Sequence, residues 1–249
     1  MGKTLIKILF FSFLLFLPGF FAFASVATPI KILLVPGHDN KVWGAQYGNI
    51  KEADMNLTLA KQIFDILSQD KRFKVYITRD KNGYLKEFSD YFTNNIKSTI
   101  AFLDEAKKGM KEEVANGDFV KKVNPPHHAV SEDVALRLYG LNKWANENKI
   151  DAMIHVHFND YPRKTKWSMG KYKGFVIYMP DSQFVNAEGS TKLANSIFTE
   201  LHKKYITSTY GNEKGGLIPD QKLIALGANN TLVKSVRSIL IEYGYIYRF

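Results

Sequence analysis

The sequence has no cysteine among its 249 residues. This absence excludes a disulfide framework, a cysteine for lipid attachment and any metal site built on thiolates. A transition-metal site in this chain must therefore use histidine, aspartate or glutamate. Histidine is also scarce, with six residues in all, so the position of each one is informative.

The sequence also lacks internal repeats, low-complexity linkers and a compositional break that would mark a second folded domain. Hydrophobic residues make up 45% and aromatic residues 14% of the chain, which is enough to build a substantial core. Because no disulfide is available, this core, helped by any bound metal, must hold the fold together.

Residues 1–24 are predicted to be a secretory signal peptide. Lys3 and Lys7 accompany the apolar stretch LFFSFLLFLPGFFAF, and Ala22-Phe23-Ala24 has the small-x-small pattern of a cleavage site. A retained membrane anchor is the alternative, but Pro18 inside the stretch favours cleavage. We therefore expect an exported protein, in the periplasm or the extracellular space, without stable membrane insertion after cleavage.

Acidic residues are outnumbered by basic ones, 24 to 34, which gives a formal net charge of +10. Loss of Lys3 and Lys7 with the signal peptide would leave about +8. In an exported protein this charge favours an acidic extracellular partner, such as an anionic envelope polymer or a membrane surface, over a nucleic acid. A general contribution to solubility explains the charge equally well.

Hydrophobic periodicity predicts one α/β domain over residues 29–249. Strands are expected at 30–35, 73–78, 151–157, 174–179 and 237–242, and helices at about 53–68, 131–148 and 187–204. The strand–helix–strand order implies right-handed parallel crossovers. The expected architecture is a mostly parallel sheet of about six strands, flanked by helices on both faces. Residues 207–220 read as a glycine-rich loop, followed by a short helix near 221–226.

Residues 81–130 do not fit this alternation and are predicted to be a helical, solvated insertion at the edge of the fold. A charged helical stretch runs from about 85 to 114, and the segment NPPHH at 124–128 breaks it. His127 and His128 in that segment would form either a surface metal pair or part of an ordinary exposed loop.

Four residues lie where such a fold would place metal-binding or catalytic side chains: His38, Glu52, His157 and Glu242. Three of them follow the ends of predicted strands, and Glu52 opens a predicted helix. The carboxyl ends of strands in an open α/β sheet meet at one crevice. Two neutral imidazoles and a carboxylate suffice for a catalytic zinc site with one open position, and a second carboxylate can move protons. Each residue alone has an ordinary structural explanation, but together they indicate a zinc hydrolase.

The ordered motifs of the chain resemble those of the zinc-dependent N-acetylmuramoyl-L-alanine amidases, the amidase-3 type of peptidoglycan hydrolase. The matching pieces run in the family's order from LLVPGHDN through KEADMNLTLAKQI, KVYITRD, RLYGLNKWAN and DAMIHVHFND to ILIEYGYI. The resemblance implies one zinc ion per chain, with His38, Glu52 and His157 as its ligands. It implies that Glu242 is the catalytic general base and acid.

The resemblance also implies the reaction and the partners. The amide between N-acetylmuramic acid and L-alanine of peptidoglycan would be hydrolysed by a zinc-bound water that Glu242 deprotonates. The expected partners are peptidoglycan and a protein activator, the expected state is a monomer, and the expected location extends to the cell wall. Arg137 and Asn146 match family positions that would support the fold and the site rather than react.

The sequence departs from the family's pattern in three places. Val35 stands where the family usually has aspartate, His155 stands where it often has serine, and the segment 81–130 is longer than usual. His155 and His157 share one face of their strand, because side chains alternate with a period of two. Either could therefore be the ligand, although the H-x-N register with Asn159 favours His157.

The loop 160–173 interleaves lysines with Tyr161, Trp167 and Tyr172 close to the predicted site. These aromatic side chains could stack on sugar rings, and the lysines could meet carboxylates of a stem peptide. A solvated loop explains the same composition.

Two other functions are compatible with the sequence. A zinc carboxypeptidase-like amidohydrolase would need an arginine to bind a terminal carboxylate, and Arg79, Arg163 and Arg237 are available. A non-catalytic envelope-binding or regulatory module would be expected to have lost part of the ligand set or Glu242, and all four residues are present.

Overall fold

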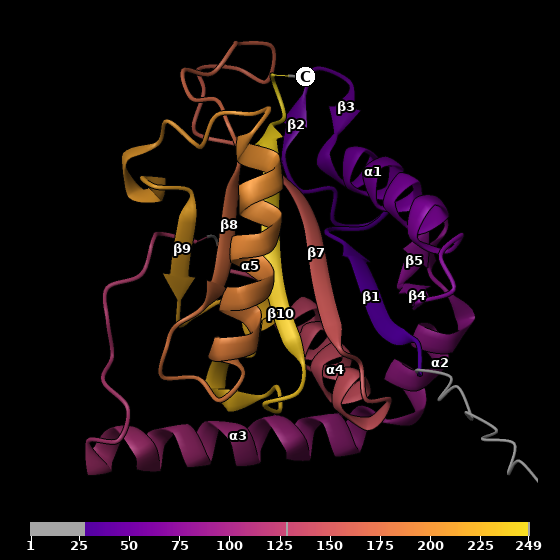
Figure 1. Ribbon diagram of the computed structural model, residues 1–249, viewed down its shortest axis with the longest axis vertical. Helices are drawn as coiled ribbons and strands as arrows, with labels where there is room; N and C mark the ends of the chain where they lie inside the picture. The colour runs from indigo at the N-terminus through magenta and orange to yellow at the C-terminus, as the bar shows by residue number, and fades with distance from the viewer. Residues whose placement is uncertain (1–27, 128, 249) are drawn as a thin grey trace, which may run out of the picture.

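The computed structural model describes residues 28–127 and 129–248 (Figure 1). The predicted signal peptide, residues 1–24, lies outside the described residues. The described chain is built on a six-stranded sheet with the strand order β4-β1-β7-β10-β8-β9. Its strands are β1 (Ile30–Pro36), β4 (Phe73–Ile77), β7 (Ala152–Asn159), β8 (Val176–Pro180), β9 (Leu217–Asp220) and β10 (Arg237–Tyr245).

The predicted α/β class is confirmed, and so is the mostly parallel sheet. Strands β4, β1, β7 and β10 are parallel neighbours, β8 is antiparallel to β10, and β9 is parallel to β8. Helices α1 (Glu52–Leu67) and α5 (Ala187–His202) cover one face. Helices α2 (Lys86–Asn94) and α4 (Glu132–Glu147) pack on the other. None of the helices within the described ranges is long and apolar enough to cross a membrane.

Apolar side chains on both faces hold the sheet between these helices. In β1, Ile32 and Leu34 enter the core under α1 and α5, whereas Leu33 and Val35 enter the core under α2 and α4. Burial on both faces is why β1 reads as an unbroken apolar run rather than an alternating one. Val35, which replaces the family's usual aspartate, is therefore a core residue, 4% exposed.

The sixth strand, β9, was not predicted, because the sequence indicated only a glycine-rich loop at 207–220. The strand has four residues, LIPD, and it pairs on one side only, with β8. Pro219 is exposed on this edge, where a missing N–H costs no ladder hydrogen bond. The short helix expected near 221–226 is a single 3-10 turn, η2 (Ile224–Leu226).

The segment 81–130 contains the predicted helical stretch, divided into α2 and α3 (Ile96–Asn116). In Figure 1, α3 runs across the lower end of the molecule, opposite the end to which β1, β7 and β10 point. After Gly117 the chain returns past β9 to Ser131, the N-cap residue of α4. We call residues 117–127 and 129–131 the strap.

The remaining elements are short and lie between the main ones. They are β2 (Gln46–Tyr47), β3 (Ile50–Lys51), β5 (Arg79–Asp80), β6 (Gly83–Tyr84), η1 (Gly211–Glu213) and η3 (Ala228–Asn230).

A single buried arginine joins the end of β1 to the start of α1. Arg79 is 3% exposed. Its guanidinium donates to the carbonyl oxygens of Pro36 (3.1 Å), Gly37 (3.0 Å) and Ala53 (2.8 Å). The first two carbonyls belong to the two residues before His38, and the third belongs to the residue after Glu52. Arg79 therefore fixes the backbone on which two of the predicted ligands stand.

Replacing Arg79 with methionine should cost on the order of 3 kcal/mol of unfolding free energy, because three buried carbonyl oxygens lose a charged donor. Chemical denaturation of the two proteins measures the difference. Arg72→Met is the matched control, because the exposed Arg72 contacts its chain neighbours Asp70 and Phe73 and its loss should change the midpoint little. Equal midpoints for wild type and Arg79→Met would contradict this role.

Candidate active site

His38 stands on a tight turn immediately after β1. Its φ angle is 60°, a left-handed conformation that few residues other than glycine adopt. The preceding Gly37 allows the ring of His157 to approach, since a Cβ on Gly37 would lie 2.1 Å from His157 Cε1. The motif PGH therefore has a steric purpose, because it brings the imidazoles of His38 and His157 to a ring-centroid distance of 5.2 Å.

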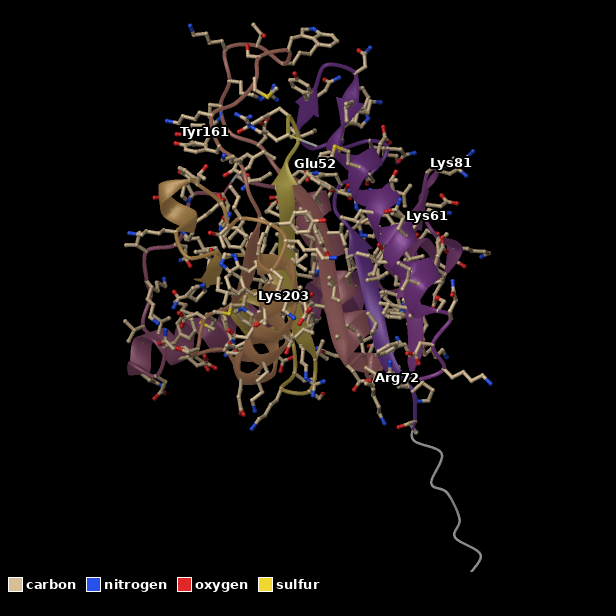
Figure 2. The ribbon with its side chains drawn as sticks, turned by 45° about the horizontal axis from the view of Figure 1, so that its top comes forward. Glu52, Lys61, Arg72, Lys81, Tyr161 and Lys203 are labelled. Carbon is tan, nitrogen blue, oxygen red and sulfur yellow. The ribbon has the colours of Figure 1, made fainter. Side chains whose placement is uncertain are left out.

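Glu52, labelled in Figure 2, opens α1, and its carboxylate contacts both histidines. Its Oε1 lies 3.1 Å from His157 Nδ1, and its Oε2 lies 3.2 Å from His38 Nε2. The backbone N–H of Ala45 donates to Oε2 (2.9 Å), and Asn56 Nδ2 donates to Oε1 (3.2 Å). These bonds hold a carboxylate that is 4% exposed in one orientation.

The pKa of Glu52 shows that the cluster holds a negative charge. Burial alone would raise the pKa of its carboxyl group, but hydrogen bonds with His157 and His38 outweigh burial and lower that pKa below its usual range. The carboxylate is thus held as an anion inside the protein. A buried anion requires a neighbouring positive charge, which protonated histidines or a metal cation can supply.

The donor set fits a metal ion. One ligand atom each from His38, Glu52 and His157 lies within 4.8 Å of the other two. Tetrahedral zinc with bonds of about 2.0–2.1 Å separates its ligand atoms by roughly 3.3 Å, and each oxygen of Glu52 lies close to that distance from one imidazole nitrogen. A Cβ on Gly44 would lie 2.4 Å from Glu52 Oε2 and from His38 Cδ2, so glycine keeps this side of the cluster open. The side chains of His38 and His157 remain 29% and 18% exposed.

Glu242 lies beside this cluster on the neighbouring strand. It is the register partner of His157 where β10 pairs with β7. Its Oε2 is buried and has no hydrogen-bond partner among the described residues. Burial, reinforced by the charges of Glu52 and Glu213, raises the pKa of Glu242 well above its usual value. A carboxyl group of this kind can hold a proton and release it to a partner that enters the site.

His155 lies outside the three-residue cluster. It is 2% exposed, and burial lowers its pKa to about 3, with a smaller contribution from His157. It forms a hydrogen bond with the backbone of Ala225, and its Nε2 is buried without a partner among the described residues. The described structure thus groups His157 with the other two predicted ligands. His155 lies two residues earlier on β7 and is buried.

Glu213 supports the same end of the sheet, a role that could not be predicted from its local sequence. This 3% exposed residue accepts hydrogen bonds from Asn159 (2.7 Å), Tyr178 (2.9 Å), Tyr245 (3.1 Å) and Ser208. Its four donors come from four separate segments of the chain. In the sequence GNEKGG it resembles an ordinary turn glutamate, because nothing local reveals such distant partners.

The loop 160–173 is held in place by Arg163. This side chain pairs with Asp160 (2.9 Å) and donates to the carbonyl oxygen of Gln46 (2.7 Å). Tyr161, labelled in Figure 2, packs in an aromatic cluster with Tyr172 and Tyr210, at centroid distances of 4.6 and 5.1 Å. The loop is therefore structured rather than merely solvated.

The supporting residues expected on α4 have different positions. Asn146 donates to the carbonyl oxygen of Thr231 (3.0 Å) and accepts from the N–H of Val233 (3.1 Å), which fixes the chain before β10. Arg137 forms an ion pair with Asp133 and lines a cavity next to the cluster.

His127 is held against the body of the protein rather than free in an exposed loop. Its Nε2 lies 2.7 Å from Asp220 Oδ2, and its ring contacts Tyr178 edge-on at 5.5 Å. Burial alone would raise the pKa of Asp220, but the bond with His127 and two backbone N–H donors lower it. His128 lies outside the described residues, so the alternative of a metal pair stays untested.

Comparisons with known proteins identify the family of this chain. The family model described as N-acetylmuramoyl-L-alanine amidase, Amidase_3, matches residues 32–248. A curated relative, the probable N-acetylmuramoyl-L-alanine amidase AmiB of Haemophilus influenzae, is 37% identical over 81 residues. That match covers 32% of this chain and only 18% of the relative's length.

Two solved structures share the fold at low sequence identity. The catalytic domain of CwlV, an N-acetylmuramoyl-L-alanine amidase from Bacillus (Paenibacillus) polymyxa var. colistinus, has a TM-score of 0.51 and 16% identity, covering 88% of this chain and 82% of that one. The CwlD amidase of Clostridioides difficile, in complex with the GerS lipoprotein, has a TM-score of 0.50 and 14% identity, covering 88% and 83%. Since the family model spans nearly all of the described residues, the chain belongs to the Amidase_3 family of N-acetylmuramoyl-L-alanine amidases.

Proposed function

We propose that this protein is an exported zinc-dependent amidase that hydrolyses the amide between N-acetylmuramic acid and L-alanine of peptidoglycan. The observation that carries the proposal is the convergence of His38, Glu52 and His157 beside Glu242, whose buried Oε2 has no hydrogen-bond partner among the described residues. Membership of the amidase family supports the choice of substrate.

His38, Glu52 and His157 would hold the metal. When bound there, zinc supplies Lewis-acid chemistry, which polarises a carbonyl group and lowers the pKa of water. Ala45 and Asn56 fix the carboxylate of Glu52 by hydrogen bonds, and such bonds to a ligand's free positions orient it for the metal.

Glu242 would move the proton. Its carboxylate accepts a proton from the water that attacks the carbonyl carbon of the lactyl group. Its raised pKa favours keeping that proton until the carbon–nitrogen bond breaks. The same carboxyl group then donates the proton to the leaving amine of L-alanine.

The carboxypeptidase alternative is less well supported. Of the three arginines that could bind a terminal carboxylate, Arg79 donates to buried carbonyl oxygens, and Arg163 is committed to Asp160 in its own loop and to the carbonyl oxygen of Gln46. Arg237 begins β10, at the opposite end of that strand from Glu242. The described structure therefore offers none of these three as a carboxylate clamp at the site.

The proposal includes location and partners. Export rests on the predicted signal peptide, and peptidoglycan is the proposed polymer partner. The similar CwlD amidase was solved in complex with a lipoprotein, which supports a protein partner for this chain as part of the proposal. We propose a monomer that binds no nucleic acid.

Glu242→Gln should lower turnover by about two to four orders of magnitude, because glutamine cannot accept or donate the proton. Digests of purified sacculi would be assayed for newly released amino termini of L-alanine. Chelator should abolish the release by wild-type protein, and added zinc should restore it.

Zinc content of the Glu242→Gln protein should equal that of wild type, which separates proton transfer from metal binding. Wild-type protein that releases no L-alanine amino termini in the presence of zinc would contradict the proposed reaction. Full activity of Glu242→Gln would contradict the role of Glu242.

His157→Ala should lose the bound zinc, whereas His155→Ala should retain it, because only His157 lies within the three-residue cluster. Elemental analysis of the purified proteins gives the zinc-to-protein ratio. Zinc should also raise the melting temperature of His155→Ala but not of His157→Ala, since a ligand stabilises the state that binds it. The reverse pattern would assign His155 as the ligand.

A further inference from the structure

A cavity of about 380 Å³ opens next to the proposed metal site. His38 and His157 border it, and Val35, His155 and Leu240 line it from the sheet. Helix α4 contributes Val134, Arg137 and Leu138, and the turn at η2 contributes Leu223, Ile224 and Ala225. The cavity therefore extends from the metal site along the face of the sheet that α4 covers.

The strap forms another wall of this cavity. His127, Ala129 and Val130 line it directly. The strap belongs to the long segment that distinguishes this chain from the family's usual pattern. The wall is thus a feature of this chain's own sequence rather than of the shared sheet.

Several contacts along the strap hold this wall against the body of the protein. Phe119 packs on Phe184 at a centroid distance of 5.3 Å. Lys122 pairs with Asp181 (2.8 Å), and the N–H of Gln221 donates to Asn124 Oδ1 (2.7 Å).

The bond between His127 and Asp220 then fixes the last part of the strap before Ala129 and Val130. These contacts, which run from Phe119 to His127, make the strap a docked segment rather than a loose loop.

The chemistry of the cavity favours a peptide over a sugar. About half of the lining residues are aliphatic, and this part of the wall accepts methyl groups but offers no partner to the hydroxyls of a sugar ring. Arg137 and Lys222 add positive charge that can meet a carboxylate. The exposed Trp43 and Trp167, which suit stacking on sugar rings, lie outside the cavity.

We propose that this cavity binds the stem-peptide side of the substrate, and that the strap determines which peptides fit. The inference rests on the proposed function, since it takes the peptide of peptidoglycan as the ligand. A cavity of this size holds a small ligand, on the order of two or three peptide residues. The lactyl and alanyl methyl groups contact the aliphatic wall, and the next residue's carboxylate meets Arg137 or Lys222.

Val130→Trp tests the role of the strap, because the larger side chain would fill part of the cavity from the wall that the strap forms. The ligand is a free stem tripeptide that begins with L-alanine and D-glutamate, titrated by calorimetry into zinc-loaded protein. Val130→Trp should weaken its binding at least tenfold and raise KM for a muramoyl tripeptide by a similar factor. kcat should change little, because the metal site and Glu242 are untouched.

Val123→Trp is the matched control, because Val123 lies in the same strap, is fully exposed and does not line the cavity. It should bind the tripeptide as wild type does. Melting temperature and zinc content verify folding of both variants. If Val130→Trp does not fold, Ala129→Leu makes a smaller addition to the same wall and should weaken binding in the same direction.

The outcomes separate this inference from the proposed reaction. An active wild-type amidase whose folded strap variants bind the tripeptide as tightly as wild type overturns the strap's role alone. Tripeptide binding that Val130→Trp weakens, in a protein without amidase activity, supports the peptide cavity and overturns the proposed reaction. Wild-type protein that binds a muramoyl sugar but no tripeptide overturns the assignment of the cavity.

Discussion

The structure depends on keeping one negative charge, the Glu52 carboxylate, inside the protein at the end of the sheet. Burial of an anion is costly unless it is compensated, and here two imidazoles lie within 3.2 Å of its oxygens. Backbone and amide donors from Ala45 and Asn56 occupy further positions. A divalent cation bound at this point would neutralise the buried carboxylate and would form the centre of the site.

The surrounding fold supplies the geometry that this charge requires. Arg79 joins the end of β1 to the first turn of α1, so His38 and Glu52 are positioned by one guanidinium. Pairing of β7 with β10 sets His157 beside Glu242. Glu242, whose Oε2 is buried, is thereby placed near a second carboxylate, which raises the pKa of Glu242 further and suits it to proton transfer.

Much of this could be predicted from the sequence, because the signals are local. Local motifs predicted where the site residues lie: a strand ending in PGH, a glutamate opening a helix and an apolar run ending in glutamate. The missed features depend on distant partners. β9 is four residues with a proline, and Glu213 is bound by donors from several segments. The docking of the strap pairs residues 59 to 101 positions apart. Such pairings leave no local periodicity, so only the folded structure reveals them.

The central claim is that His38, Glu52 and His157 bind one zinc ion beside a carboxyl group that is not a ligand. Anomalous diffraction at the zinc absorption edge from crystals of zinc-loaded protein tests this directly. The account predicts one peak about 2.0–2.2 Å from a ligand atom of each of the three residues, with Glu242 uncoordinated. A peak bound by His155 or by Glu242 in place of one of the three would contradict it, and so would the absence of a peak at this site.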